Sequence, residues 1–182
     1  MATIHVLDET TINKIAAGEV VERPASVIKE LIENSIDASA TNIEVEIGEG
    51  GVAYMRITDN GIGMTEEDAR LAILRHATSK IQPVEDLFDI ASLGFRGEAL
   101  ASIASVSHFS LTTRKADSDL GTRITVDGGT FTDCIPYGAA PGTTIEIKDL
   151  FYNTPARRKF LKTERTEASK IQDIVGKLAL SN

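Results

Sequence analysis

The sequence predicts an α+β fold, a two-layer sandwich in which helices cover a mixed, mainly antiparallel sheet. Two observations favour this fold. Most helical patterns lie in the earlier part of the chain, whereas several strand-like stretches follow one another later without helices between them. No regular alternation of strand and helix occurs, which disfavours a parallel sheet of the Rossmann type. The 182 residues are enough to build one buried core.

The first part of the chain supplies helices and a hairpin. Gly18 ends a short predicted helix, Pro24 begins a longer one with apolar residues at three- and four-residue spacing, and Thr65 begins a third. Apolar and polar residues alternate in two stretches on either side of a glycine-rich turn, which predicts a β-hairpin. The predicted helices cover residues 8–18, 24–39 and 65–75, and the predicted strands cover residues 42–48 and 52–58.

The second part begins with a long loop, residues 76–97, and a helix over about residues 97–104. The strand-like stretches of the meander then cover residues 109–114, 122–126, 131–135 and 143–147. Pro155 begins a final helical stretch with a break near Thr163.

Charge is distributed unevenly along the chain. The net charge of -8 argues against a protein that coats nucleic acid or an anionic membrane with its whole surface. Residues 149–182 are locally basic, because they hold 7 of the 19 Lys and Arg residues but only 4 of the 27 Asp and Glu residues. Cys134 has no second cysteine to pair with, no stretch is apolar enough to span a membrane, and the N-terminus lacks a signal-peptide pattern. We therefore expect a cytoplasmic protein with no membrane partner.

An acidic stripe lies on the second predicted helix. Glu30, Glu33, Asn34 and Asp37 fall at helical spacing on one face. One interpretation is an ordinary solvated face. The other is that the stripe faces a cavity, where a carboxylate orients a water molecule and the Asn34 amide oxygen binds Mg²⁺, which prefers oxygen ligands.

A glycine-punctuated loop, Asp59-Asn60-Gly61-Ile62-Gly63, follows the hairpin directly. Such a loop can be a plain turn. Alternatively, Asp59 accepts a hydrogen bond from an exocyclic amine such as that of adenine, and the glycines let the ligand approach the backbone. Because guanine presents an oxygen at that position, a carboxylate there would also select the base.

Two later loops have the composition of a phosphate site. Gly94 and Gly97 precede a helix, whose free N–H groups and dipole favour an anion, although the Walker A ending is missing. The alternative for this segment is a flexible connection. Thr78, Ser79 and Lys80 could close over the same phosphates or could simply be solvated.

The ordered set of motifs resembles the GHKL group of ATPases, which includes DNA gyrase B, the Hsp90 chaperones, histidine kinases and the MutL mismatch-repair proteins. The set consists of the Asn-bearing acidic helix, the strand followed by the Asp59 loop, the glycine loop before a helix, and a later strand opening at Gly142 and Thr143. The sequence around these motifs is most similar to the MutL family, over residues 15–24, 75–81, 94–100 and 149–160.

The resemblance implies a Mg-ATP site. Glu30 would activate or position the attacking water, Asn34 would bind Mg²⁺, and Asp59 would hold the adenine amine with support from Thr143. Gly61 and Gly63 would keep the base pocket open. The phosphates would be held by Thr78, Ser79, Lys80, Gly94, Phe95, Arg96, Gly97, Glu98, Ala99 and Leu100. His76 is interpreted as a buried structural residue and Cys134 as packing.

The resemblance also implies a larger assembly. Family members continue with a second subdomain that supplies a lysine to the γ-phosphate and with a C-terminal dimerisation domain, so residues 1–182 are expected to form only the ATP-binding subdomain. We expect this chain to bind ATP or ADP with weak or no turnover and to be monomeric without nucleotide. In the full-length protein the partners would be a second protomer, the mismatch-recognition protein and DNA. The basic residues Arg157, Arg158, Lys159 and Lys162 could contact DNA or the second protomer. The alternative is a switch that binds nucleotide to order its loops without hydrolysing it.

Overall fold

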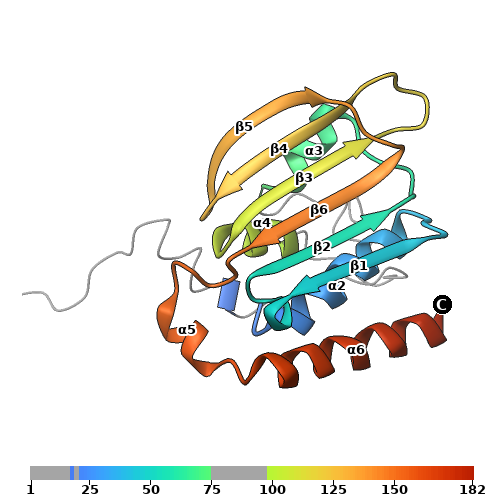
Figure 1. The fold of residues 1–182 in the computed structure, drawn as a ribbon. Helices are drawn as coiled ribbons and strands as arrows, with labels where there is room; N and C mark the ends of the chain where they lie inside the picture. Colours follow the sequence, from blue (N-terminus) through green and yellow to red (C-terminus); the bar gives the residue numbers. More distant parts are fainter. Residues whose placement is uncertain (1–16, 19–20, 75–97) are drawn as a thin grey trace, which may run out of the picture.

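The computed structural model describes residues 17–18, 21–74 and 98–182 (Figure 1). In these residues, helix α2 (Pro24–Asp37) precedes strand β1 (Ile43–Gly48), the short 3₁₀ turn η1 (Glu49–Gly51) and strand β2 (Tyr54–Asp59). Helices α3 (Glu66–Ala72) and α4 (Ala99–Ser105) follow. Most of the predicted helix over residues 8–18 and the predicted loop over residues 76–97 lie outside the described residues.

The strands form one six-stranded sheet in the order β1-β2-β6-β3-β4-β5. The later strands are β3 (His108–Arg114), β4 (Gly121–Asp127), β5 (Thr130–Tyr137) and β6 (Gly142–Lys148). All pairings among the described strands are antiparallel, where the sequence predicted a mixed, mainly antiparallel sheet. Strand β6 inserts between β2 and β3, so it places residues from the end of the meander beside the N-terminal hairpin.

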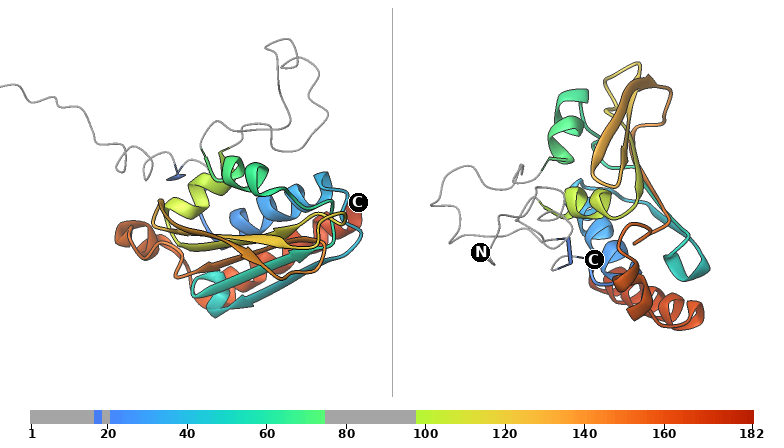
Figure 2. Two further views of the ribbon diagram at one scale, coloured as in Figure 1. Left: turned by 90° about the horizontal axis from the view of Figure 1, so that it is seen from above. Right: turned by 90° about the vertical axis from the view of Figure 1, so that its left-hand side faces the viewer.

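Helices α2, α3 and α4 lie on one face of the sheet (Figure 2). The core forms between that face and the helices. Alternate residues of β2, β3, β4 and β6 are buried, and α2 contributes Val27, Ile28 and Leu31, all of them almost fully buried. Facing them from the strands are Met55, Ile57, Phe109, Leu111, Ile124 and Ile147. The predicted α+β sandwich is therefore confirmed.

Helix α2 begins at the predicted residue and ends at Asp37, two residues before the predicted end. Pro24 stands in its first turn, where a missing N–H costs nothing. At the other end, the Ala38 N–H reaches back to the Asn34 carbonyl, and Ser39 adopts φ +59, which turns the chain out of the helix. This sharp exit directs the chain into β1, and β1 and β2 then form the predicted hairpin.

The C-terminal part consists of helices α5 (Pro155–Phe160) and α6 (Glu164–Ser181), which confirms the predicted break near Thr163. The Thr163 side chain accepts a hydrogen bond from the Thr166 N–H and so caps α6. Helix α6 lies beside α2 (Figure 1), and its fully buried Glu167 is 3.7 Å from the Arg23 guanidinium at the start of α2. Across the described ranges, no helix combines the length and the apolar character that crossing a membrane requires.

Candidate functional site

The last residue of β2 lies at the centre of a hydrogen-bond network. Asp59 pairs with Thr143 in the register of β2 and β6, so the loop after β2 and the start of β6 lie side by side. One carboxylate oxygen, Oδ1, accepts hydrogen bonds from the N–H of Gly61 at 2.9 Å and the N–H of Thr143 at 3.2 Å. The other, Oδ2, accepts the Ser35 hydroxyl at 2.8 Å. Three separate segments therefore fix the orientation of this carboxylate.

Ser35 connects the carboxylate to helix α2. Its side chain is buried, and its Oγ also lies 3.1 Å from the Leu31 carbonyl one turn earlier. A hydroxyl has a single proton, so it can donate fully either to Asp59 or to Leu31. The Asp59 contact is the shorter one and its acceptor is charged, which favours donation to the carboxylate.

A second polar group joins β6 to β3 beside Asp59. The hydroxyls of Thr143 and Thr113 lie 3.0 Å apart, and Thr113 also accepts a hydrogen bond from the Met64 N–H at 2.9 Å. The Thr113 hydroxyl lies 3.1 Å from the Gly142 carbonyl. Gly142 has φ +118, and a Cβ there would lie 2.0 Å from the Asp59 carbonyl oxygen, so only glycine fits this crossing.

The loop after β2 is held at both ends. The Asn60 side-chain oxygen accepts the backbone N–H groups of Thr41 and Asn42, each at 2.9 Å. Gly63 is buried at φ +65, where a Cβ would lie 2.0 Å from the Arg114 carbonyl oxygen. The loop that carries Gly61 and Gly63 is thus pressed against neighbouring backbone rather than free in solvent.

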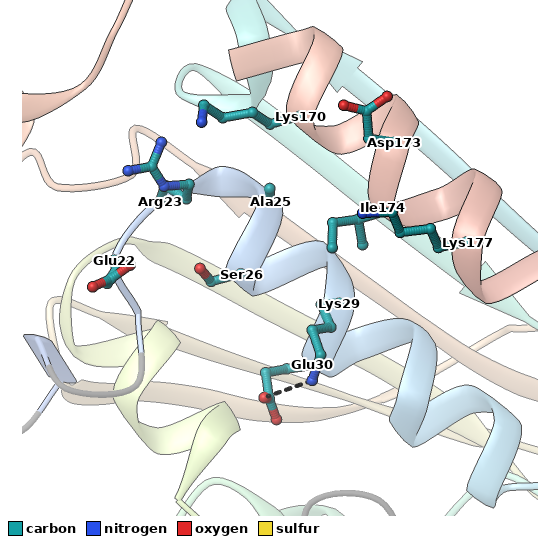
Figure 3. Close-up of a pocket in the computed structure, with 10 residues that line it drawn as sticks. All are labelled: Glu22, Arg23, Ala25, Ser26, Lys29, Glu30, Lys170, Asp173, Ile174 and Lys177. Carbon is teal, nitrogen blue, oxygen red and sulfur yellow. Dashed lines mark ion pairs between the residues drawn. The ribbon is translucent and has the colours of Figure 1, made fainter. Parts of the chain in front are cut away.

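Glu30 and Asn34 lie one turn apart on α2, and both are partly buried. Glu30 lines a cavity of about 470 Å³ between α2 and α6. Figure 3 shows that its other polar lining side chains come from both helices: Glu22, Arg23, Ser26 and Lys29 from α2 or its start, and Lys170, Asp173 and Lys177 from α6. The predicted acidic stripe is therefore only partly solvated, because Glu33 is buried.

Part of the predicted phosphate site is described. Glu98 is the N-cap residue of α4, and Ala99 and Leu100 form its first turn, all three partly buried. His76 lies outside the described residues. So do the remaining predicted phosphate contacts, which are Thr78, Ser79, Lys80, Gly94, Phe95, Arg96 and Gly97.

The oxygen donors on α2 are compatible with a Mg²⁺ ion that is also bound by the phosphate oxygens of a nucleotide. In the described ranges, no group of three or more His, Cys, Asp or Glu side chains is arranged to hold a metal ion. Mg²⁺ commonly takes only one or two protein ligands and completes its shell with phosphate oxygens and water. A single amide oxygen from Asn34 is compatible with that kind of site.

Two further residues belong to the network and have no local sequence signal. Ser35 contacts Asp59 across 24 positions of the chain, and Thr113 contacts Thr143 across 30. Both contacts depend on how the strands and helix α2 pack together, which a serine or a threonine in the sequence does not reveal. For Ser35, the one sequence signal is that it directly follows Asn34, a predicted site residue.

Three other features noted in the sequence or structure lie away from Asp59: Cys134, Tyr152 and the basic residues of α5. Cys134 is partly buried on β5, opposite Ile124, and burial raises the pKa of its thiol. Before α5, Tyr152 stacks on His108, and burial together with its hydrogen bond to Asp127 raises the pKa of Tyr152 to about 12. The basic residues Arg157, Arg158 and Lys159 lie on α5, where the last two are exposed.

Comparison with protein families decides the assignment. Residues 22–130, more than half of the chain, match the family described as histidine kinase-, DNA gyrase B- and HSP90-like ATPase. The chain belongs to this ATPase family. The matched region of this ATPase includes α2, the Asp59 loop and Thr113, and ends before Thr143.

Within the ATPase family, the chain is similar to MutL proteins over its whole length. It is 59% identical over 182 residues to the DNA mismatch repair protein MutL of Caldanaerobacter subterraneus subsp. tengcongensis, covering 100% of this chain and 31% of that protein. The chain thus spans about a third of the length of the curated relatives that it matches.

Solved structures give the same result. The Aquifex aeolicus MutL ATPase domain complexed with ADP superimposes with a TM-score of 0.70 at 38% identity, covering 90% of this chain and 57% of that chain. The N-terminal domain of a DNA repair protein superimposes with a TM-score of 0.74 at 30% identity, covering 90% of this chain and 47% of that one. The α+β sandwich is therefore the fold of MutL ATPase domains.

Proposed function

We propose that this chain is the Mg-ATP-binding and ATP-hydrolysing module of a MutL-type DNA mismatch-repair protein. The single observation that carries this proposal is the fixed Asp59 carboxylate at the end of β2, held by Ser35, Gly61 and Thr143. The membership in the ATPase family and the similarity to a MutL domain complexed with ADP support it.

The adenine base would bind at Asp59. A carboxylate accepts hydrogen bonds only, so it pairs with the exocyclic amine of adenine and opposes the exocyclic oxygen that guanine has in the same place. Thr143 would support this contact through its hydroxyl. Gly61 and Gly63 would keep the base pocket open indirectly, because they let the loop pack closely against Ala38 and Arg114. Each carboxylate oxygen of Asp59 has two lone pairs, so Oδ2 can accept the amine while it keeps the hydrogen bond from Ser35.

The phosphates would extend from there toward α2 and the start of α4. Glu30 would position the attacking water and accept its proton. Asn34 would hold Mg²⁺, which neutralises phosphate charge when bound. Main-chain N–H groups of Glu98, Ala99 and Leu100 would contact the phosphates, together with Thr78, Ser79, Lys80, Gly94, Phe95, Arg96 and Gly97. Phosphoryl transfer depends mainly on positioning and charge stabilisation, so one base and several donors are sufficient.

The repair role rests on the similarity to MutL. We propose that residues 1–182 are the ATP-binding subdomain of a longer cytoplasmic protein, and that nucleotide binding switches its conformation and couples mismatch recognition to later repair steps. Its partners would be a second protomer, the mismatch-recognition protein and DNA. Alone, the chain would bind nucleotide with weak or no turnover and stay monomeric without it.

Calorimetry tests this function directly. The chain is titrated with a non-hydrolysable ATP analogue, with and without Mg²⁺. We expect saturable binding that Mg²⁺ strengthens. No heat of binding at millimolar analogue, with the chain folded by circular dichroism, would refute the proposed function.

A further inference from the structure

A lysine lies between two carboxylates on the face of α2 that carries Glu30. The ammonium nitrogen Nζ of Lys29 lies 2.9 Å from Oε1 and 3.0 Å from Oε2 of Glu33, one turn further along the helix. The same Nζ lies 3.9 Å from Oε1 of Glu30 (Figure 3). One ammonium group is thus shared by two carboxylates that the sequence predicts on a common stripe.

The position of this ammonium is fixed by the buried partner. Only 6% of the Glu33 side chain is exposed, so separating it from Lys29 would leave a buried carboxylate without its counter-charge, at a large cost in free energy. The Glu30 side chain, in contrast, is 26% exposed and contacts Lys29 at a longer distance. Lys29 is therefore anchored by Glu33, and Glu30 is the partner whose carboxylate responds to the fixed charge.

The other lysines that line this cavity differ from Lys29. Lys170 and Lys177 come from α6, and neither forms a salt bridge with another described residue. They contribute charge to the cavity without restraining a carboxylate of α2. The three lysines therefore share an electrostatic environment, and of these three it is Lys29 that forms an ion pair with Glu30.

We infer that Lys29 is a positioning residue for Glu30: anchored by Glu33, its ammonium group holds the Glu30 carboxylate in the orientation from which it directs the attacking water. This inference rests on the proposed function, in which Glu30 is the base. A carboxylate must be ordered before it can orient water, and a charge fixed within 4 Å contributes to that order in the free protein. In this role Lys29 itself contacts neither the nucleotide nor the attacking water molecule.

The test measures steady-state ATP hydrolysis by the full-length protein that carries residues 1–182. Lys29→Met should lower kcat about tenfold and leave KM for ATP within about twofold, because orientation of the base is lost while the nucleotide contacts remain. Lys29→Arg keeps a cation between the two carboxylates and should retain most of kcat. Lys177→Met is the matched control, since it removes the same charge from the same cavity, and it should leave kcat unchanged.

A double variant separates positioning from folding. Lys29→Met combined with Glu33→Gln removes the buried charge as well as its partner, so it should regain thermal stability but not kcat. The inference is refuted if kcat of the Lys29→Met protein equals that of the Lys177→Met protein, if only KM changes, or if the double variant recovers full turnover. Failure of the unsubstituted protein to hydrolyse ATP would refute the proposed function and this inference together.

Discussion

The two ends of the candidate site are built differently. At the base end, Asp59 is held by backbone and side-chain donors from α2, the loop after β2 and the start of β6, all within 3.2 Å. At the phosphate end, Glu30 and Asn34 project from a single helix, and Glu30 lies 3.9 Å from the Lys29 ammonium group on the same helix. One end is ordered by the sheet, and the other by charged side chains on helices.

This difference separates two tasks. A rigid, preformed acceptor gives selectivity among bases, because a ligand that does not match leaves buried polar groups unpaired. Charged side chains on a helix face, held in place as Lys29 is by Glu33, can instead be preorganised for the charge that develops during phosphoryl transfer. We therefore expect substitutions at the base end to change affinity and substitutions at the phosphate end to change turnover.

Asp59→Asn should have the largest effect on affinity. The amide NH₂ of asparagine would oppose the Ser35 hydroxyl or the adenine amine, where the carboxylate accepts both, so ADP affinity should fall about a hundredfold. Calorimetric titration with ADP measures the change. Asp117→Asn, on an exposed loop residue, is the control and should bind as the unsubstituted chain does. Equal ADP affinity of the Asp59→Asn and Asp117→Asn proteins would refute the assignment of Asp59 to the base pocket.

Gly142→Ala should act on folding of the base end. Its φ of +118 and the 2.0 Å approach of a Cβ to the Asp59 carbonyl oxygen force β2 and β6 apart. We expect a loss of about 2 kcal/mol or more in the free energy of unfolding, which corresponds to a melting temperature lower by about 4–8 °C. Gly176→Ala on α6, where a Cβ meets nothing within 4 Å, should be neutral or slightly stabilising. Equal melting temperatures of the Gly142→Ala and Gly176→Ala proteins would show that the contact between Gly142 and the Asp59 backbone tolerates a Cβ.

Ser35→Ala should weaken ADP binding about fivefold, because Asp59 loses the donor that orients Oδ2. The comparison variant is Ser105→Ala, which removes another buried hydroxyl that bonds a helix carbonyl, away from Asp59. Fluorescence titration with a labelled adenine nucleotide distinguishes them. A Ser35 variant that binds as tightly as the Ser105 variant would mean that the strand and loop N–H groups alone fix the carboxylate.

Glu30→Gln should have the smallest effect on affinity and a large effect on turnover. ADP affinity should stay within about twofold, while ATP hydrolysis by the full-length protein should fall about a hundredfold or more because the base is lost. Glu22→Gln, which lines the same cavity, should keep full turnover. Hydrolysis by the Glu30 variant at the unsubstituted rate would favour a nucleotide switch without a catalytic role for Glu30.

The local elements were predictable because their signals are local. Pro24 at the start of α2, Thr163 at the start of α6 and the glycine-rich turn of the hairpin all act within a few residues of themselves. Observed strand ends differ from the predicted ones by one or two residues, as at β5, where Thr130 and Tyr137 extend the strand. Such differences reflect pairing with β4, which a single strand cannot reveal.

The contacts between distant segments could not be predicted in the same way. Insertion of β6 between β2 and β3 brings Thr143 to both Asp59 and Thr113, and no sequence period encodes that order. The resemblance to known ATPases supplied Asp59 and Thr143 as a pair, but it did not supply Ser35 or Thr113. Likewise, the stripe of Glu30 and Glu33 was visible at helical spacing, whereas burial of Glu33 against Lys29 required the packed structure.

The most direct test of a base end that is preformed for adenine compares ADP with GDP on the unsubstituted chain by calorimetry under identical conditions. The structure predicts that ADP binds at least about tenfold more tightly than GDP, because the carboxylate held by Ser35, Gly61 and Thr143 meets an amine in one base and an oxygen in the other. Equal affinities for the two nucleotides, or tighter binding of GDP, would contradict it.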